Sequence, residues 1–247
     1  GTVQVKAIPG RLLYCGYDVV DMVRQLERDG RFGFEETIYL LLSGVLPDAS
    51  DLYHFSQLLA TRGSLGRKER GILMQDAENE NQMYALHSVV SHLGRCDRNP
   101  DTSVLADVSK QCINIVAKMP AIVAYNYQVL RFRKGKDLMI IKPDPELSFA
   151  ENFLYMLKGR RPTRQEAQLF DLCLILHAEH GGGNNSTFAV RTVSSSGANT
   201  YMAICSGIAS LSGHLHGGAN ESVIAMMQDI KEKEIRKKNL LDPGHLR

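Results

Sequence analysis

Apolar residues recur at the spacing of an α-helix along most of the chain, and several such segments end on residues that stop a helix. In the segment FGFEETIYLLLSGVLP, which begins at Phe32, the apolar side chains on one face are Phe34, Ile38, Leu41 and Leu42. Gly44 can adopt the left-handed conformation that closes a helix, and Pro47 prevents its continuation. The pattern predicts one helix that ends near Gly44.

A longer apolar pattern begins at Asp101 and predicts two further helices. In DTSVLADVSKQCINIVAKMP the helically spaced positions are Val104, Leu105, Val108, Cys112, Ile115 and Val116. Proline has no backbone N–H and is favoured in the first turn of a helix, so we expect Pro120 to open a second helix over PAIVAYNYQVLRF. The sequence therefore predicts a helix boundary at Pro120.

Two more helices are predicted, each beside a segment rich in histidine and glycine. The first, TRQEAQLFDLCLILHAEHG, has Thr163 and Glu166 at the spacing of a capping box and meets Gly181 at its end. The side chains expected to point inward are Leu169, Leu172, Cys173 and Leu176. This pattern places His180 at the C-terminus of a helix.

The second of these helices follows His216, in the segment GGANESVIAMMQDIKEKEI. Asn220 is a residue type that can cap a helix N-terminus. The apolar stripe predicted for the helix is Val223, Met226, Met227 and Ile230. His216 is therefore expected just before a helix N-terminus.

The predicted fold class is all-α, a multihelical domain with at most a short hairpin in the first 15 residues. The 247 residues suffice for one large core, and a net charge of +2 gives no reason to expect a nucleic-acid partner or an anionic membrane surface. The longest apolar runs, TIYLLL and LCLIL, are too short to cross a bilayer, and no basic-then-apolar leader is visible. We expect a cytoplasmic protein with no membrane partner.

Cysteine spacing argues against a disulfide framework and against a zinc site. The five cysteines are odd in number, widely spaced and contain no CxxC pair: Cys15, Cys96, Cys112, Cys173 and Cys205. We expect them to be reduced and buried in the core.

Two segments bring histidine next to glycine and asparagine: HAEHGGGNNSTF, from His177, and GHLHGGANES, which contains His216. A phosphate-binding loop is disfavoured because no strand precedes the glycines and no Lys-Ser/Thr pair follows them. A metal site is disfavoured because His177 and His180 supply only two ring nitrogens where the helix ends. Helix termination explains one such segment but not two. The pattern favours a site at which the backbone approaches a ligand closely.

The region from Leu176 onward, LHAEHGGGNNSTFAVRTVSSSGANTYMAICSGIASLSGHLHGGANESV, resembles the central signature of the citrate synthase family, which includes the 2-methylcitrate synthases. Four upstream segments are similar to family segments in the same order: GRLLYCGYDVVDMV, FEETIYLLLSGVLP, VAKMPAIVAYNY and PDPELSFAENFLYML. The resemblance extends to about Ile230. It implies that residues 1–230 form a citrate synthase-like large helical domain, and that residues 231–247 are a charged tail or the truncated start of the connection to a small domain.

The resemblance implies a condensation of acetyl-CoA with oxaloacetate to citrate and coenzyme A. Carried over by position, His216 is the catalytic group that donates to the thioester oxygen as the enol forms. His180 and Asn184 bind oxaloacetate, and Ser186 holds the other ring nitrogen of His216. The coenzyme A thioester is a co-substrate, and neither a metal ion nor an organic cofactor is implied.

The family's second catalytic histidine, its aspartate base, its substrate arginines and most coenzyme A contacts lie in a smaller domain that is not visible in this sequence. We therefore expect the chain to be a piece of a longer protein and inactive by itself. One alternative is a 2-methylcitrate synthase that uses propionyl-CoA, and another is a noncatalytic dimerising or regulatory helical domain. A homodimer is expected through large-domain helices, and the segments SVVSHLG and VAKMPAIVAYNY belong either to that interface or to the core of one chain.

Overall fold

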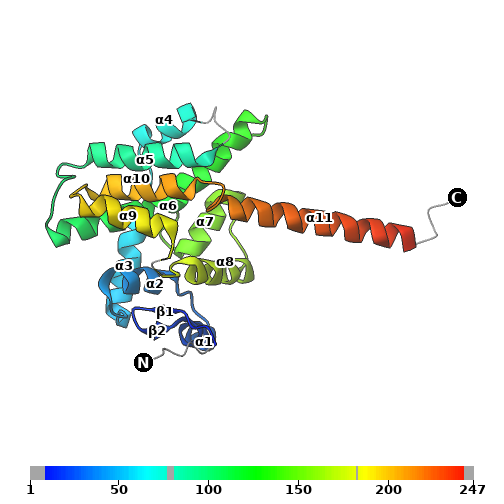
Figure 1. Cartoon of the computed structure of the whole chain (residues 1–247), viewed down its shortest axis with the longest axis horizontal. Helices are drawn as coiled ribbons and strands as arrows, with labels where there is room; N and C mark the ends of the chain where they lie inside the picture. Colours follow the sequence, from blue (N-terminus) through cyan, green and yellow to red (C-terminus); the bar gives the residue numbers. More distant parts are fainter. Residues whose placement is uncertain (1–8, 77–80, 182, 242–247) are drawn as a thin grey trace, which may run out of the picture.

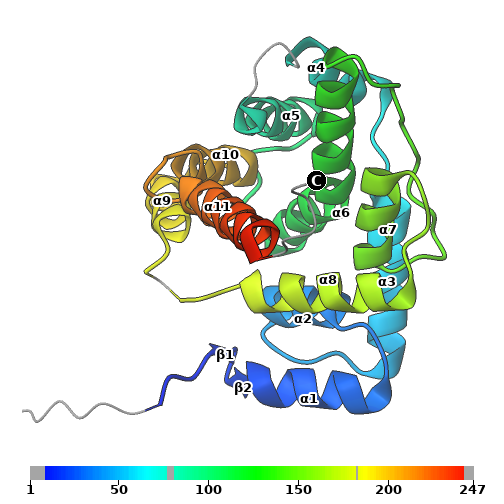
Figure 2. The ribbon, with the colours of Figure 1, turned by 90° about the vertical axis from the view of Figure 1, so that its right-hand side faces the viewer.

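The computed structural model describes residues 9–76, 81–181 and 183–241, and in these ranges the chain is built almost entirely from helices (Figures 1 and 2). The elements in chain order are β1 (Leu13–Tyr14), β2 (Tyr17–Asp18), α1 (Val19–Asp29), α2 (Phe34–Ser43), α3 (Ala49–Arg62), α4 (Arg67–Asp76), α5 (Gln82–Cys96), α6 (Leu105–Arg133), α7 (Phe149–Lys158), α8 (Arg164–His177), α9 (Asn185–Ser195), α10 (Thr200–Leu211) and α11 (Gly218–Leu241). The all-α prediction is confirmed. The two strands pair as an antiparallel hairpin. It begins within the first 15 residues, where a hairpin was predicted, and ends beyond them at Asp18.

The N-terminal helices are formed and closed by the residues that the sequence pattern singles out. α2 ends at Gly44, which has a left-handed φ of 82° as predicted. α1 ends in the same way at Gly30, with a φ of 61°. The hairpin, α1, α2 and α8 enclose one buried cluster, whose buried members are Tyr14, Val19, Met22, Leu26, Leu40 and Ile175. This cluster fixes α8 against the N-terminal helices.

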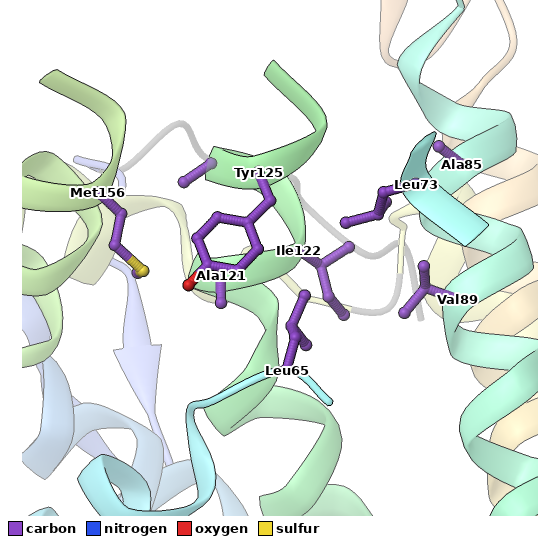
Figure 3. Packing of buried hydrophobic residues seen from close by; sticks show 9 residues of the cluster. Leu65, Leu73, Ala85, Val89, Ala121, Ile122, Tyr125 and Met156 are labelled. Carbon is purple, nitrogen blue, oxygen red and sulfur yellow. The ribbon is translucent and has the colours of Figure 1, made fainter. Parts of the chain in front are cut away.

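α6 runs through Pro120 without a break, so the predicted division into two helices is wrong. Proline in a helix interior removes a backbone hydrogen bond and costs about 3 kcal/mol or more. Pro120 is itself buried, and the buried apolar positions around it are Ile115, Ala117, Ala121, Ile122, Ala124 and Tyr125. Figure 3 shows Ile122 on α6 between Met156 of α7 and Val89 of α5. Burial on both sides of one continuous helix explains why α6 tolerates the proline.

The two segments considered for a dimer interface contribute to the core of one chain. Val89, Val90 and Leu93 of SVVSHLG lie on α5 and are at most 5% exposed. Ile122 and Tyr125 of VAKMPAIVAYNY lie on α6 and are equally buried. These side chains belong to the core of one chain, whereas Val123 and Tyr127 of the second segment are 39% and 44% exposed.

α8 has the predicted N-terminus but a different buried face. Thr163 Oγ accepts a hydrogen bond from Glu166 N at 3.2 Å, and a carboxylate oxygen of Glu166 accepts one from Thr163 N at 2.8 Å. The two bonds together form the capping box. The buried positions are Ala167, Asp171 and Ile175, whereas Leu169, Cys173 and Leu176 are exposed and Leu172 is half-buried. The cause is Asp171, whose carboxylate accepts from Gly33 N at 2.8 Å and Phe34 N at 3.2 Å. It caps the N-terminus of α2, where Gly33 has no side chain to do so.

α11 projects from the rest of the molecule (Figures 1 and 2) and packs along no other helix in the described ranges. It begins at Gly218, so Asn220 lies two residues inside the helix rather than before it. The predicted stripe of Val223, Met226, Met227 and Ile230 is 42–57% exposed. The helix continues past residue 230, and residues 242–247 of the predicted tail lie outside the described ranges. Neither α11 nor any other described helix is long and apolar enough to cross a membrane.

All five cysteines are free, but burial was predicted for more of them than the structure shows. Cys205 is buried and Cys112 half-buried, whereas Cys15, Cys96 and Cys173 are exposed. Cys173 is exposed for the same reason as Leu169 and Leu176, because Asp171 turns the opposite face of α8 inward.

Candidate active site

All four site residues predicted from the sequence lie around the N-terminal end of α9. Asn184 is the N-cap of this helix, and Ser186 lies in its first turn. His180 lies in the loop between α8 and α9, and His216 lies in the turn between α10 and α11. The structure thus brings the two histidine–glycine segments to a single helix end, although 36 residues separate His180 from His216.

His180 is held by the residue that caps α9. Asn184 Oδ1 accepts from Thr187 N at 3.0 Å, which orients the amide so that its nitrogen faces the His180 ring. The distance from Asn184 Nδ2 to His180 Nε2 is 2.9 Å. Because Nδ2 donates, Nε2 must accept, and a neutral ring with its proton on Nδ1 satisfies this contact. His180 is an exposed residue.

The loop that carries His180 is tied to the N-terminal hairpin. α8 ends at His177, so His180 lies three residues beyond the helix rather than in its last turn. The buried Tyr14 hydroxyl donates to Ile175 O at 2.6 Å and accepts from Glu179 N at 3.4 Å. Burial raises the pKa of Tyr14 above its ordinary value of 10.0, so the phenol stays protonated and remains a donor.

Ser186 connects the His216 ring to two helices at once. Its Oγ lies 2.9 Å from His216 Nε2 and 2.9 Å from Gly207 O on α10. α9 and α10 approach closely enough for this because residue 207 is glycine: a Cβ there would lie 2.8 Å from Val190 Cγ2. Gly207 is therefore part of the support of the His216 ring.

The turn that carries His216 also depends on a glycine. His216 N donates to Gly213 O at 3.0 Å, and Gly217 N donates to Leu211 O at 3.1 Å. A Cβ at position 217 would lie 2.2 Å from the same Leu211 oxygen, which is backbone and cannot move aside cheaply. The glycine after the histidine in GHLHGGANES is thus explained by a close backbone approach within the turn.

The single proton of the Ser186 hydroxyl decides what the His216 ring can do. If the hydroxyl donates to Gly207 O, His216 donates from Nε2, and its Nδ1 is left as an acceptor. If the hydroxyl donates to Nε2, the ring carries its proton on Nδ1 and can donate to a carbonyl oxygen. A neutral imidazole in this second state polarises a carbonyl without acting as a strong acid. In the structure the hydroxyl donates to Gly207 O, which can only accept, so the half-buried His216 ring donates from Nε2 to Ser186 Oγ. The second state requires the hydroxyl to turn from Gly207 O to Nε2.

Metal coordination is not offered by the part of the chain that the structure describes. No group of three or more His, Cys, Asp or Glu side chains in these ranges is placed to hold a metal ion. His177, the other histidine of the first segment, lies with its Nδ1 2.7 Å from Cys173 O on its own helix.

Sequence reasoning did not identify Gly207 and Tyr14 as supports of the site. Gly207 lies within an apolar helical pattern, and only the crossing of α9 and α10 makes its missing Cβ necessary. Tyr14 contacts residues more than 160 positions away, so no local spacing could have indicated its role.

Sequence comparison shows the family to which these segments belong. The family described as "Citrate synthase, C-terminal domain" matches residues 2–242. A citrate synthase of Haloferax volcanii is 39% identical over 233 residues, which cover 92% of this chain and 58% of that protein. A 2-methylcitrate synthase of Mycobacterium tuberculosis is 34% identical over 252 residues, covering 97% of this chain and 61% of that protein. The chain thus spans about three-fifths of the length of these relatives.

Solved structures agree with the sequence comparison. The crystal structure of citrate synthase from Pyrobaculum aerophilum superposes with a TM-score of 0.79 at 30% identity, covering 98% of this chain and 62% of that chain. Citrate synthase from Thermotoga maritima superposes with a TM-score of 0.72 at 31% identity, covering 94% of this chain and 58% of that chain. The chain belongs to the citrate synthase family.

Proposed function

We propose that this chain carries one part of the active site of an enzyme that condenses acetyl-CoA with oxaloacetate to citrate and coenzyme A. The observation that carries the proposal is the contact between Ser186 Oγ and His216 Nε2, two residues along α9 from the contact between Asn184 and His180. Relatives named citrate synthase match over more than nine-tenths of the chain, which supports the reaction class.

In the proposed reaction, His216 Nδ1–H donates to the thioester oxygen of acetyl-CoA while a base removes a methyl proton. The enol carbon then attacks the ketone of oxaloacetate, which is bound beside His180 and Asn184. Water finally hydrolyses the citryl thioester to citrate and coenzyme A. We assign the base and the remaining oxaloacetate contacts to sequence that the relatives have and this chain does not span.

The contribution of His216 depends on Ser186. A preorganised donor of this kind contributes about 10²–10³ to kcat, provided that it points at the developing charge. For this role the Ser186 hydroxyl must turn from Gly207 O, to which it donates in the structure, and donate to His216 Nε2 instead. Since proton abstraction needs the base as well, we expect the chain by itself to show no thiol release above background with acetyl-CoA and oxaloacetate.

Oxaloacetate binding tests the proposal in the chain as it stands. Calorimetry or chemical-shift titration should show binding that His180→Ala weakens by about tenfold or more, since a charge-assisted hydrogen bond is lost. His177→Ala is the matched control, because His177 lies in the same segment but bonds back to Cys173. Equal affinity of the two variants would contradict the assignment of His180.

The 2-methylcitrate synthase alternative rests on the Mycobacterium tuberculosis relative, which matches 97% of the chain. Acetyl-CoA and propionyl-CoA differ by one methylene, a difference that pockets discriminate by about 1–3 kcal/mol. Comparing kcat/KM for the two thioesters in the protein that contains this chain decides between them.

A homodimer built through the large-domain helices also remains a proposal, and light scattering of the purified chain tests it. A chain that dimerises but does not bind oxaloacetate would favour the noncatalytic, regulatory alternative.

A further inference from the structure

A groove of about 760 Å³ opens between α5, α6 and the C-terminal end of α7, on a surface that the proposed reaction does not use. Figure 2 shows α6 between α5 and α7. Two contacts fix this geometry: Asn126 Nδ2 donates to Gln82 O at 3.1 Å, and Gln128 Nε2 donates to Leu157 O at 2.7 Å. The groove is therefore a feature of helix packing, and its volume falls in the range of small-molecule sites.

The floor of the groove is apolar. Its apolar lining residues are Met83 and Leu86 from α5, Ile122 and Val123 from α6, and Leu157 from α7. Ile122 is fully buried and belongs to the central cluster in Figure 3, whereas Val123 is 39% exposed on the next position of the same helix. The floor is thus continuous with the core, and it presents aliphatic surface that a ligand can cover.

The rim of the groove is positively charged. The charged lining residues are Arg131, Lys158 and Arg160, and none of the lining side chains in the described ranges is acidic. Glu166, outside the groove, pairs with both Lys158 and Arg160 at 2.8 Å and offsets one of their two charges. Arg131 lies 6.0 Å from the centroid of the Tyr127 ring, which holds its guanidinium over the groove wall. The rim therefore keeps an excess of positive charge.

One buried polar atom points to a ligand as well. Asn126 lines the groove and is 5% exposed. Its amide nitrogen is used by Gln82 O, whereas its Oδ1 receives no hydrogen bond from the described residues. A buried acceptor without a donor is costly, so a ligand that brings a hydroxyl, or a water carried with it, is favoured at this position.

We propose that this groove binds an amphiphilic monocarboxylate, with an aliphatic body on the floor and the carboxylate at Arg131. Aliphatic surface beside Arg131, which pairs with no carboxylate in the described ranges, matches a ligand that is apolar at one end and anionic at the other. This site is separate from His180 and His216, and the inference does not depend on the proposed condensation.

The test uses octanoate and the complete chain, with octanol and octylamine as ligands of the same length. Octanoate should shift backbone amide signals of α5 and of the C-terminal half of α6, with a Kd of about 0.1–10 mM for ten non-hydrogen atoms. Arg131→Gln should weaken binding about tenfold. Val123→Glu, which places a carboxylate on an exposed part of the floor, should abolish it. Arg133→Gln, two residues along and outside the groove, should leave the Kd unchanged.

Octylamine or octanol binding as tightly as octanoate would overturn the proposal, because the rim would then contribute nothing. The proposal also fails if Arg131→Gln and Arg133→Gln have the same Kd, or if octanoate shifts signals across the whole surface or none at all. Circular dichroism of each variant ensures that a lost interaction is not a lost fold.

Discussion

α6 and α11 are the two longest helices of the chain, and both carry apolar residues at helical spacing, yet only α6 is buried. α6 lies between α5 and α7, and its residues Ile122 and Val129 are at most 1% exposed. α11 presents Met227 and Ile230 at 57% and 53% exposure along a helix that leaves the body. An apolar stripe therefore predicts a helix, but it does not say whether the surface that covers the stripe belongs to the same chain.

The relatives of this chain are longer than the chain itself. The chain spans 58–62% of the Haloferax volcanii and Pyrobaculum aerophilum proteins, and 98% of it superposes on the latter. In the described ranges, no other helix packs along α11. In the chain alone, its apolar face should add little to the free energy of unfolding, unlike the core of α6.

The largest effect is expected from the same substitution made in both helices. Ile122→Ala should lower the free energy of unfolding by about 2–5 kcal/mol, because it leaves a cavity in the central cluster. Ile230→Ala on α11 should change it by less than about 0.5 kcal/mol. Urea denaturation of the two variants measures both. Equal losses would show that α11 packs against the body in solution.

A smaller effect is expected at the junction between the body and α11. Gly217→Ala should cost about 1–3 kcal/mol, since the new Cβ meets Leu211 O and the turn that holds His216 must shift. Gly71→Ala, inside α4 with open space around it, is the control and should stabilise the chain by about 0.5–1 kcal/mol. Thermal denaturation compares the two. A neutral Gly217→Ala would mean that the turn is less constrained than the backbone indicates.

The smallest effect is a pH dependence that belongs to the buried body alone. Burial raises the pKa of Glu35 above its ordinary value of 4.5, and the nearby Asp171 and Glu151 carboxylates raise it further, although the hydrogen bond from Phe149 N opposes the shift. The folded chain thus binds this proton more tightly than the unfolded chain. The stabilisation is complete below pH 4.5 and is lost as pH rises through the folded pKa.

Glu35→Gln keeps an acceptor for Phe149 N and removes the titration. Relative to the unsubstituted chain, the variant should gain stability as pH rises from 4 to 7, which urea denaturation at each pH can follow. Glu221→Gln on α11 makes the same change at an exposed position and should alter the free energy of unfolding by less than about 0.5 kcal/mol. A difference between Glu35→Gln and the unsubstituted chain that does not change with pH would contradict the buried acid.

Sequence patterns predicted the local features of the fold and missed those set by distant contacts. The capping box at Thr163 and the left-handed Gly44 depend on neighbours within a few residues, and both were predicted correctly. The inward face of α8 depends on Asp171 capping α2, 138 positions away. The continuity of α6 depends on cover from α5 and α7, and α11 is exposed because no other described helix packs along it.

The candidate site shows the same division. The resemblance to citrate synthases identified Ser186 and His216 as a pair, and the structure places them 2.9 Å apart. Gly207 was missed because a missing Cβ becomes necessary only where two helices cross. The resemblance therefore named the candidate site residues, whereas the residues that hold them in place are determined by helix packing.

The central claim is that in solution the Ser186 hydroxyl, at the start of α9, donates to His216 Nε2 rather than to Gly207 O, and so leaves Nδ1–H free to donate. Long-range proton–nitrogen NMR spectra of the histidine rings test this directly. The account predicts that His216 carries its proton on Nδ1 with Nε2 as a hydrogen-bonded acceptor, and that Ser186→Ala changes this pattern while leaving His177 unaffected. A ring protonated on Nε2, or one that does not respond to Ser186→Ala, would contradict it.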